Sequence, residues 1–130
     1  MPTAIDTSVL IAAEKGGNFF DFISAIPGDF YIPAHAAAEF LAGIHPPVKE
    51  HLRERARRIY ENYFREIVQP FEEPDAAQLA ALNAELRRTG NSMKLYDAAI
   101  AATAIARGDS ILAVDSDFDR LSDRLQILKP

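Results

Sequence analysis

Short apolar segments alternate with longer helix-like segments along most of the chain. The short segments favour strands and occur near Thr3 to Asp6, Phe30 to Pro33, Ile67 to Gln69, Ile111 to Val114 and Leu125 to Leu128. The helix-like segments cover Ser8 to Lys15, Phe19 to Ile26, the stretch from Pro33 to about Gly43, Val48 to Phe64, Pro74 to just before Gly90, and Met93 to Arg107. This alternation predicts an α/β fold, a three-layer α/β/α sandwich with a mostly parallel central sheet.

The segment from Val48 to Phe64 has the clearest helical period. Its apolar residues recur at three- and four-residue steps and form one face: Val48, Leu52, Ala56, Ile59, Tyr60, Tyr63 and Phe64. The opposite side carries the charged residues Lys49, Glu50, Arg53, Glu54, Arg57 and Glu61. We therefore expect an amphipathic helix whose apolar side contacts other protein atoms.

Composition narrows the class of protein. A chain of 130 residues suits one compact domain, residues 1–130, and its 48% hydrophobic and 25% charged residues are typical of soluble globular proteins. No apolar stretch approaches the roughly 20 residues that span a bilayer, so we expect a cytoplasmic protein with no membrane partner. Because the chain has no Cys, carboxylates and the three His are the candidate metal ligands.

The net charge of -5 argues against nucleic-acid binding by bulk charge alone. It does not exclude a nuclease, because carboxylates that hold cations contribute to the negative count. Five acidic residues lie at the joints of the predicted elements: Asp6, Glu39, Asp97, Asp115 and Asp117. Asp6 and Asp115 follow predicted strands, so both should open onto the crevice at the carboxyl ends of a parallel sheet. Together the five predict an oxygen-rich site for a hard divalent cation, and hence a metal-dependent nuclease.

Each acid also has a simpler explanation. Asp97 lies in an apolar helix, where an ionised carboxylate is costly unless it is paired, and Lys94 is three residues away on the same face. Asp6 could cap the following helix, Glu39 could be a solvated helix residue, and Asp115 could begin an Asx turn. These explanations are separate, whereas one metal site accounts for all the acids together.

The acidic motifs resemble those of a known family. They are Asp6-Thr7-Ser8, Ala38-Glu39-Phe40 with Gly43, Tyr96-Asp97-Ala98-Ala99-Ile100-Ala101-Ala102-Thr103-Ala104, and Val114-Asp115-Ser116-Asp117-Phe118. In this order and over this length they resemble the four acidic motifs of the PIN domain, most of all the small PIN ribonucleases of the VapC toxin type.

The resemblance implies roles for individual residues. Asp6, Glu39 and Asp97 correspond to the core metal-binding acids. The fourth acid of the family usually lies three residues before a Phe, which points to Asp115 ahead of Phe118. Asp117 instead matches the Asp-Phe pair that is also frequent in the family. Relatives often carry Thr two residues before the fourth acid, where this chain has Ala113. Ser8 matches a small hydroxyl residue that hydrogen-bonds within the carboxylate cluster.

The resemblance also implies a chemistry and partners. Mg²⁺ or Mn²⁺ would activate a water that attacks RNA in line, which leaves a 5′ phosphate and a 3′ hydroxyl. One carboxylate, Asp97 or the fourth acid, would orient that water or accept its proton. Proteins of this type commonly form homodimers and pair with an antitoxin, which inserts a segment into a groove near the acids. The apolar side of the segment from Val48 to Phe64 could line such a groove or pack in the core.

Substrate contacts and the enzyme class leave alternatives. Arg53, Arg57 and Lys94 could contact RNA phosphates, although the two arginines also fit a solvated face with glutamate partners. Tyr96 could stack on a base, but the sequence favours packing in the core. An aspartate-based phosphoryl-transfer protein is a second class, weakened because Asp6 has no acidic neighbour, and a degenerate PIN-fold binding module is a third.

Overall fold

A parallel five-stranded sheet forms the centre of the molecule, with strand order β3-β2-β1-β4-β5. The computed structural model describes residues 2–16, 19–24, 26–44 and 49–130. The strands are β1 (Thr3–Ile5), β2 (Phe30–Pro33), β3 (Val68–Gln69), β4 (Ser110–Leu112) and β5 (Ile127–Leu128). The predicted strands are thus present, each within about two residues of its expected bounds.

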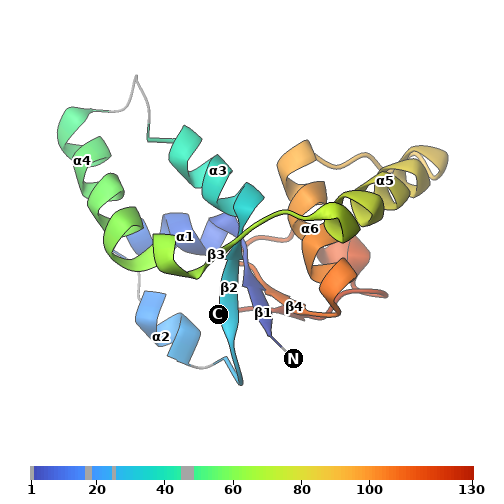
Figure 1. Ribbon diagram of the computed structural model, residues 1–130, viewed down its shortest axis with the longest axis horizontal. Coiled ribbons are helices and arrows are strands. Elements are labelled where there is room, and N and C mark those ends of the chain that lie inside the picture. The colour runs from blue at the N-terminus through green and yellow to red at the C-terminus, as the bar shows by residue number, and fades with distance from the viewer. Residues whose placement is uncertain (1, 17–18, 25, 45–48) are drawn as a thin grey trace.

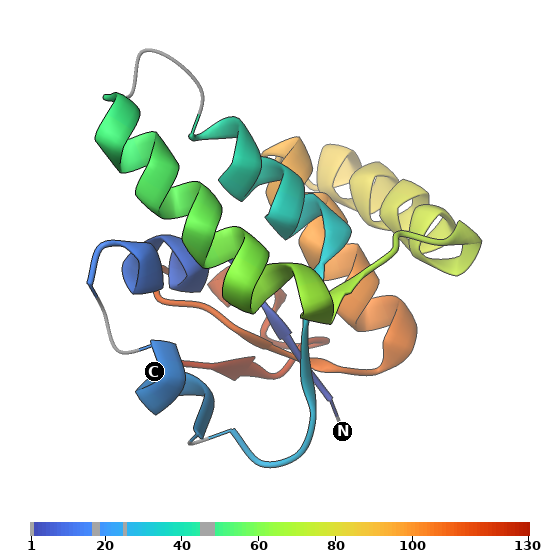
Figure 2. The same ribbon diagram turned by 60° about the vertical axis from the view of Figure 1, so that its left-hand side comes forward.

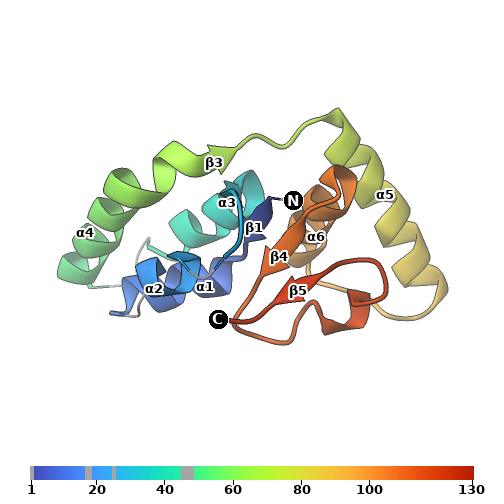
Figure 3. The ribbon, with the colours of Figure 1, turned by 90° about the horizontal axis from the view of Figure 1, so that it is seen from below.

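Helices cover both faces of this sheet, which confirms the predicted sandwich. Figures 1 and 3 show α1 to α4 on one side of the sheet and α5 and α6 on the other. The helices are α1 (Thr7–Glu14), α2 (Phe19–Ser24), α3 (Ala34–Ala42), α4 (Glu50–Ile59), α5 (Glu73–Arg88) and α6 (Leu95–Arg107). Within the described ranges, none of these helices has the length and apolar character needed to span a bilayer.

The strand order fixes where a site can form. From β1 the chain adds β2 and β3 on one side, then crosses to add β4 and β5 on the other. The direction therefore switches between β1 and β4, and the crevice outside the carboxyl ends of these two strands is the usual ligand site of such sheets. Asp6 directly follows β1, and the loop with Asp115 and Asp117 follows β4.

The α6 helix packs in the interior, as its composition predicts. Seven consecutive residues from Ala98 to Ala104 are buried, because their small side chains let the helix approach the sheet and its neighbours closely. Gly108 ends the helix in the left-handed conformation, with a φ of 70° that glycine adopts at little cost. The first turn of α6 reaches the edge of the crevice and carries Asp97.

The predicted helix from Val48 to Phe64 differs from the observed one. The α-helix ends at Ile59 and continues as a wider π-helical turn (Tyr60–Phe64) and a 3-10 turn (Arg65–Ile67), while Val48 lies outside the described residues. The apolar side is only partly covered: Ala56 and Phe64 are buried, whereas Leu52 is 39% exposed. Figure 2 shows α4 beside α3, and Phe40 of α3 packs edge to face against Phe64 at 5.4 Å.

Two buried acids that the sequence did not single out have clear structural partners. Asp75 of α5 accepts a hydrogen bond from Arg107 of α6 at 2.9 Å, which joins the two helices. Asp109 accepts a hydrogen bond from the Tyr31 hydroxyl at 2.7 Å. Buried carboxylates with such partners are satisfied within the fold and require no ligand.

Candidate active site

The five predicted acids line one cavity of about 130 Å³. It lies beyond the carboxyl ends of β1 and β4, bordered by α1, α3, α6 and the loop after β4. Its lining residues are Asp6, Thr7, Ser8, Ile11, Glu39, Lys94, Asp97, Asp115 and Asp117. Residues separated by more than 100 positions in sequence therefore meet at the crevice that the sheet topology creates.

Asp6 is the most buried of these acids, with only 2% of its surface exposed. Its Oδ2 caps α1 and accepts hydrogen bonds from the Ser8 backbone N at 3.1 Å and the Ser8 Oγ at 2.7 Å. The capping explanation is thus confirmed for one oxygen. The other oxygen, Oδ1, is buried and has no hydrogen-bond partner among the described residues. Since an unpaired buried carboxylate oxygen is costly, this atom is a candidate ligand for a cation.

Ser8 joins the two strand ends that form the site. Its hydroxyl donates to Asp6 and accepts a hydrogen bond from the Val114 backbone N at 3.0 Å. Beyond Val114 the backbone N of Asp117 donates to Asp115 Oδ1 at 3.3 Å, which confirms the expected Asx turn. Lys129 then donates to the backbone oxygen of Asp115. These contacts hold the loop after β4 against the start of α1.

Burial and mutual repulsion raise the pKa values of two of the carboxyl groups. Burial raises the pKa of Asp6 to about 6, opposed by the hydrogen bonds from Ser8 and increased by the charge of Asp115. The pKa of Asp97 is also raised to about 6, first by burial and then by the negative charges of Asp117, Asp6, Glu39 and Asp115. Asp97 thus experiences the field of all four other acids. Each of these acids would lose repulsion if a cation entered the cavity.

Lys94 does not neutralise Asp97 in the way that the simpler explanation requires. Lys94 lines the cavity and is exposed, yet within the described part of the chain no ion pair joins it to Asp97. Lys94 instead places one positive charge at the rim of a strongly negative site.

The donor set fits a hydrated divalent cation. All the charged donors are carboxylate oxygens, the ligands that hard cations prefer, and one of them lacks a partner. Among the described residues no three His, Asp or Glu side chains are arranged to hold an ion by themselves. A cation here would keep much of its water shell, which Mg²⁺ tolerates, because Mg²⁺ usually keeps several waters and takes only one or two carboxylates directly.

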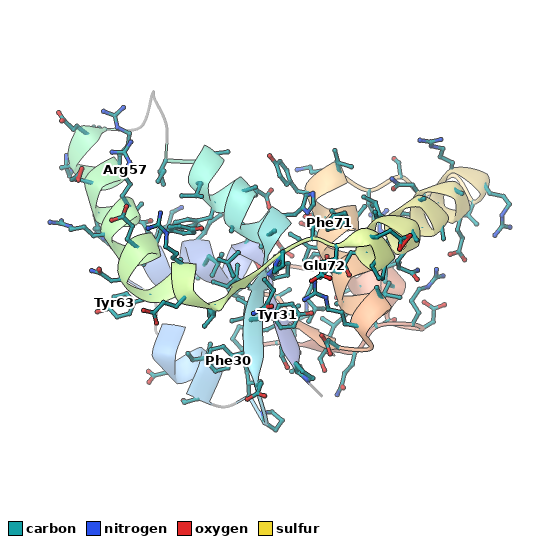
Figure 4. The ribbon with its side chains drawn as sticks, viewed as in Figure 1. Phe30, Tyr31, Arg57, Tyr63, Phe71 and Glu72 are labelled. Carbon is teal, nitrogen blue, oxygen red and sulfur yellow. The ribbon has the colours of Figure 1, made fainter. Side chains whose placement is uncertain are left out.

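Other residues predicted to contact substrate lie elsewhere. Arg53 and Arg57 do not line the cavity, and Figure 4 shows Arg57 on α4, on the opposite side of the molecule from α5. Arg57 pairs with Glu54 at 3.7 Å, as the solvated-face alternative expects. Arg53 is half-buried, with a buried Nε that has no hydrogen-bond partner in the described residues, so it does not extend a solvated stripe.

The sequence analysis missed two lining residues, Thr7 and Ile11. The sequence did contain a signal for both residues. Thr7 adjoins Asp6, and Ile11 lies one helical turn after Thr7 on the same helix. Thr7 is buried and its hydroxyl donates to the Ala36 backbone oxygen at 3.5 Å, which links α1 to α3.

A second, larger cavity adjoins the acidic one. It has a volume of about 470 Å³ and lies between α1, α3 and α4. We call it the α4 groove; its lining residues are Ile11, Glu14, Lys15, Glu39, Phe40, Gly43, Ile44, Leu52, Arg55 and Ala56. Ile11 and Glu39 line both cavities. A polypeptide in the α4 groove would therefore reach the acids.

Comparison with known proteins agrees with this geometry. A family model described as "PIN domain" matches residues 3–124. No curated protein matches the chain.

Solved structures share the fold at low sequence identity. VapBC2 from Rickettsia felis, bound to a promoter DNA fragment, has a TM-score of 0.85 at 16% identity and covers 100% of this chain and 99% of that chain. DNA-bound VapBC from Salmonella typhimurium has a TM-score of 0.85 at 20% identity and covers 99% of this chain and 98% of that chain. The Mycobacterium tuberculosis toxin VapC20, whose structure is described as that of a sarcin-ricin loop cleaving toxin, has a TM-score of 0.67 at 16% identity, with 92% and 94% covered.

Proposed function

The chain belongs to the PIN domain family, and on that basis we propose that it is a Mg²⁺- or Mn²⁺-dependent endoribonuclease, the VapC-type toxin of a toxin-antitoxin pair. The observation that carries this proposal is the buried Oδ1 of Asp6, which has no partner in the described part of the chain, within a cavity lined by four further acids. A degenerate binding module would have no need to keep these carboxylates together at the cost of their mutual repulsion. As a ribonuclease it would act in the cytoplasm, where its RNA is found.

We assign the residues of the cavity to separate tasks. Asp6, Glu39, Asp97 and Asp115 would hold the hydrated cation, one or two of them directly and the others through its waters, and Ser8 fixes the orientation of Asp6 through the 2.7 Å hydrogen bond. A bound divalent cation supplies positive charge for the phosphate and acidifies water at neutral pH. Asp117, exposed at the rim, accepts the proton of the attacking water. Lys94 attracts the phosphate backbone toward the cavity.

RNA cleavage by the purified protein tests this function. We expect cleavage with Mg²⁺ or Mn²⁺, none with EDTA, and recovery when excess cation is restored. Attack by water leaves a 5′ phosphate and a 3′ hydroxyl, so the new 5′ ends should ligate to an adaptor directly and report the cleavage sites. Cleavage that persists in EDTA, or products with a 2′,3′-cyclic phosphate, would contradict the proposal.

We further propose that the α4 groove receives a segment of the antitoxin. Support comes from its size, its lining of apolar and charged side chains, and the toxin-antitoxin complexes among the structural neighbours. Such a segment would approach Glu39 and so interfere with the acids directly. We also expect the toxin to be a homodimer in solution, which sedimentation velocity would show.

Leu52→Asp should weaken binding of the co-encoded antitoxin by about tenfold or more. The substitution removes an apolar side chain that the antitoxin would bury and places a charge in the same pocket. Leu52 is 39% exposed, so the substitution should leave the toxin folded. Leu95→Asp is the matched control, since Leu95 is 67% exposed and does not line the α4 groove. Calorimetric titration with the antitoxin distinguishes the two variants. Equal affinity for both would place the antitoxin elsewhere.

A further inference from the structure

Three aromatic rings form a row beside the acidic cavity, which we call the aromatic row: Phe71, His35 and Tyr96. The ring centroids of Phe71 and His35 are 4.5 Å apart and those of His35 and Tyr96 are 6.3 Å apart, both in edge-to-face geometry. The three residues come from the connection before α5, the start of α3 and the start of α6. Figure 4 shows Phe71 on that connection, close to Glu72.

Tyr96 is the exposed end of this row. The sequence favoured core packing for Tyr96, but 39% of its surface is exposed in the folded chain. An aromatic ring exposed at the edge of a site can supply apolar contact area to a ligand. Its neighbours in sequence are Leu95, which is 67% exposed, and Asp97, which lines the cavity.

The row fixes the Tyr96 ring. His35 is half-buried between Phe71 and Tyr96, and its Nδ1 is buried without a hydrogen-bond partner in the described residues. The imidazole thus serves here as a packing surface. Edge-to-face contacts of this kind hold a ring in a preferred orientation, which lowers the entropy cost of stacking a ligand on the ring.

We propose that Tyr96 is a stacking site for an unpaired base of the RNA strand, next to the nucleotide whose phosphate enters the acidic cavity. This inference rests on the proposed ribonuclease function and specifies its substrate as single-stranded RNA. Aromatic side chains bind single strands by stacking on exposed bases, whereas the bases of a duplex are already stacked on one another. Stacking also supplies affinity that charge cannot, because the cavity carries five acids and a single lysine.

Lys94 and Tyr96 divide the contact between backbone and base. Both belong to the short stretch that begins α6, and Lys94 lines the cavity while Tyr96 contacts His35 beside it. A phosphate attracted by Lys94 would carry its neighbouring base to the level of Tyr96. The stretch therefore aligns a single strand across the mouth of the cavity.

Binding of a short single-stranded RNA labelled with 2-aminopurine tests the proposal, measured in Ca²⁺, which takes the same oxygen donors as Mg²⁺. The RNA is checked on a gel for intactness. Tyr96→Ala should weaken binding roughly 5- to 150-fold and lose the fluorescence quenching that accompanies stacking. Tyr96→Phe keeps the ring, so its RNA affinity and its quenching should remain close to those of the unsubstituted protein. Tyr63→Ala is the control, since Tyr63 is 50% exposed and does not line the acidic cavity.

The outcomes separate the inference from the function on which it rests. RNA that binds the unsubstituted protein and Tyr96→Ala equally well overturns the stacking site alone. If the unsubstituted protein binds no RNA, both the function and the inference fail. If sedimentation shows that Tyr96→Ala lowers the oligomer mass and Tyr96→Phe does not restore RNA binding, Tyr96 is a contact between copies of the chain and the inference is wrong.

Discussion

Asp97→Asn should reduce metal-dependent RNA cleavage by about 10²-fold or more, because a cation held by fewer carboxylates loses part of the several kcal/mol by which it stabilises the transition state. The amide keeps the shape of the carboxyl group and removes one negative charge from the cavity. Asp97 is the acid whose pKa is raised by the charges of all four other acids, so it lies within the field that a cation would neutralise. Initial cleavage rates at saturating Mg²⁺ measure the effect.

The matched control is Asp123→Asn, because Asp123 is an exposed acid that pairs with Arg124 and does not line the cavity. It should cleave RNA at the rate of the unsubstituted protein. Unchanged cleavage by Asp97→Asn would show that this carboxylate has no part in the reaction. A circular dichroism melt of both variants confirms that the comparison is between folded proteins.

Asp6→Asn should make the cation-free protein more stable at neutral pH. Burial raises the pKa of Asp6 from 3.8 to about 6, which corresponds to a folding penalty of about 3 kcal/mol for the ionised carboxylate. The side chain is 2% exposed, so solvent screens little of this penalty. Asparagine avoids it and keeps an oxygen that can accept the hydrogen bonds from Ser8.

The penalty has a defined pH window. Between about pH 4 and 6 the folded chain binds more protons at Asp6 than the unfolded chain does, so the free energy of unfolding falls as pH rises through this range. Urea unfolding in EDTA should therefore show that Asp6→Asn has a higher free energy of unfolding than the unsubstituted protein. This difference should be near zero at pH 4 and complete at pH 7. Mg²⁺ should stabilise the unsubstituted protein more than the variant, since a cation offsets the same charge. A gain that does not change with pH would contradict this account.

The parts of the site that follow strands could be predicted from sequence. Asp6 and Asp115 come directly after apolar segments, and parallel strands bring their carboxyl ends to one edge. Asp97 was identifiable because a carboxylate in an alanine-rich helix needs a partner. These predictions depend on chain order and burial, which local sequence encodes well.

Side-chain orientation was less predictable. The α4 periodicity indicated one apolar side but could not show that the helix widens at Tyr60 or that Arg53 becomes half-buried, because such features depend on tertiary packing, here including the contact of Phe40 with Phe64. Tyr96 was expected in the core since its helix is apolar, yet the first turn of α6 reaches the surface. Tertiary contacts decide such positions, and one sequence carries little information about them.

Buried acids in this chain fall into two kinds, and their partners distinguish them. Asp75 is paired with Arg107, and Asp109 accepts a hydrogen bond from Tyr31, so both are satisfied within the fold. Asp6 is equally buried and retains an oxygen with no partner in the described residues. This oxygen is the observation that supports our proposal that Asp6 binds a cation.

Calorimetric titration of Mn²⁺ into the RNA-free protein tests the cation site most directly, without reference to RNA or antitoxin. The account predicts saturable binding that weakens as the pH is lowered through about 6, because Asp6 and Asp97 become protonated there. The same titration should show little or no saturable binding for Asp6→Asn. Binding of equal strength in the unsubstituted protein and Asp6→Asn, or no saturable binding by the unsubstituted protein above pH 7, would contradict it.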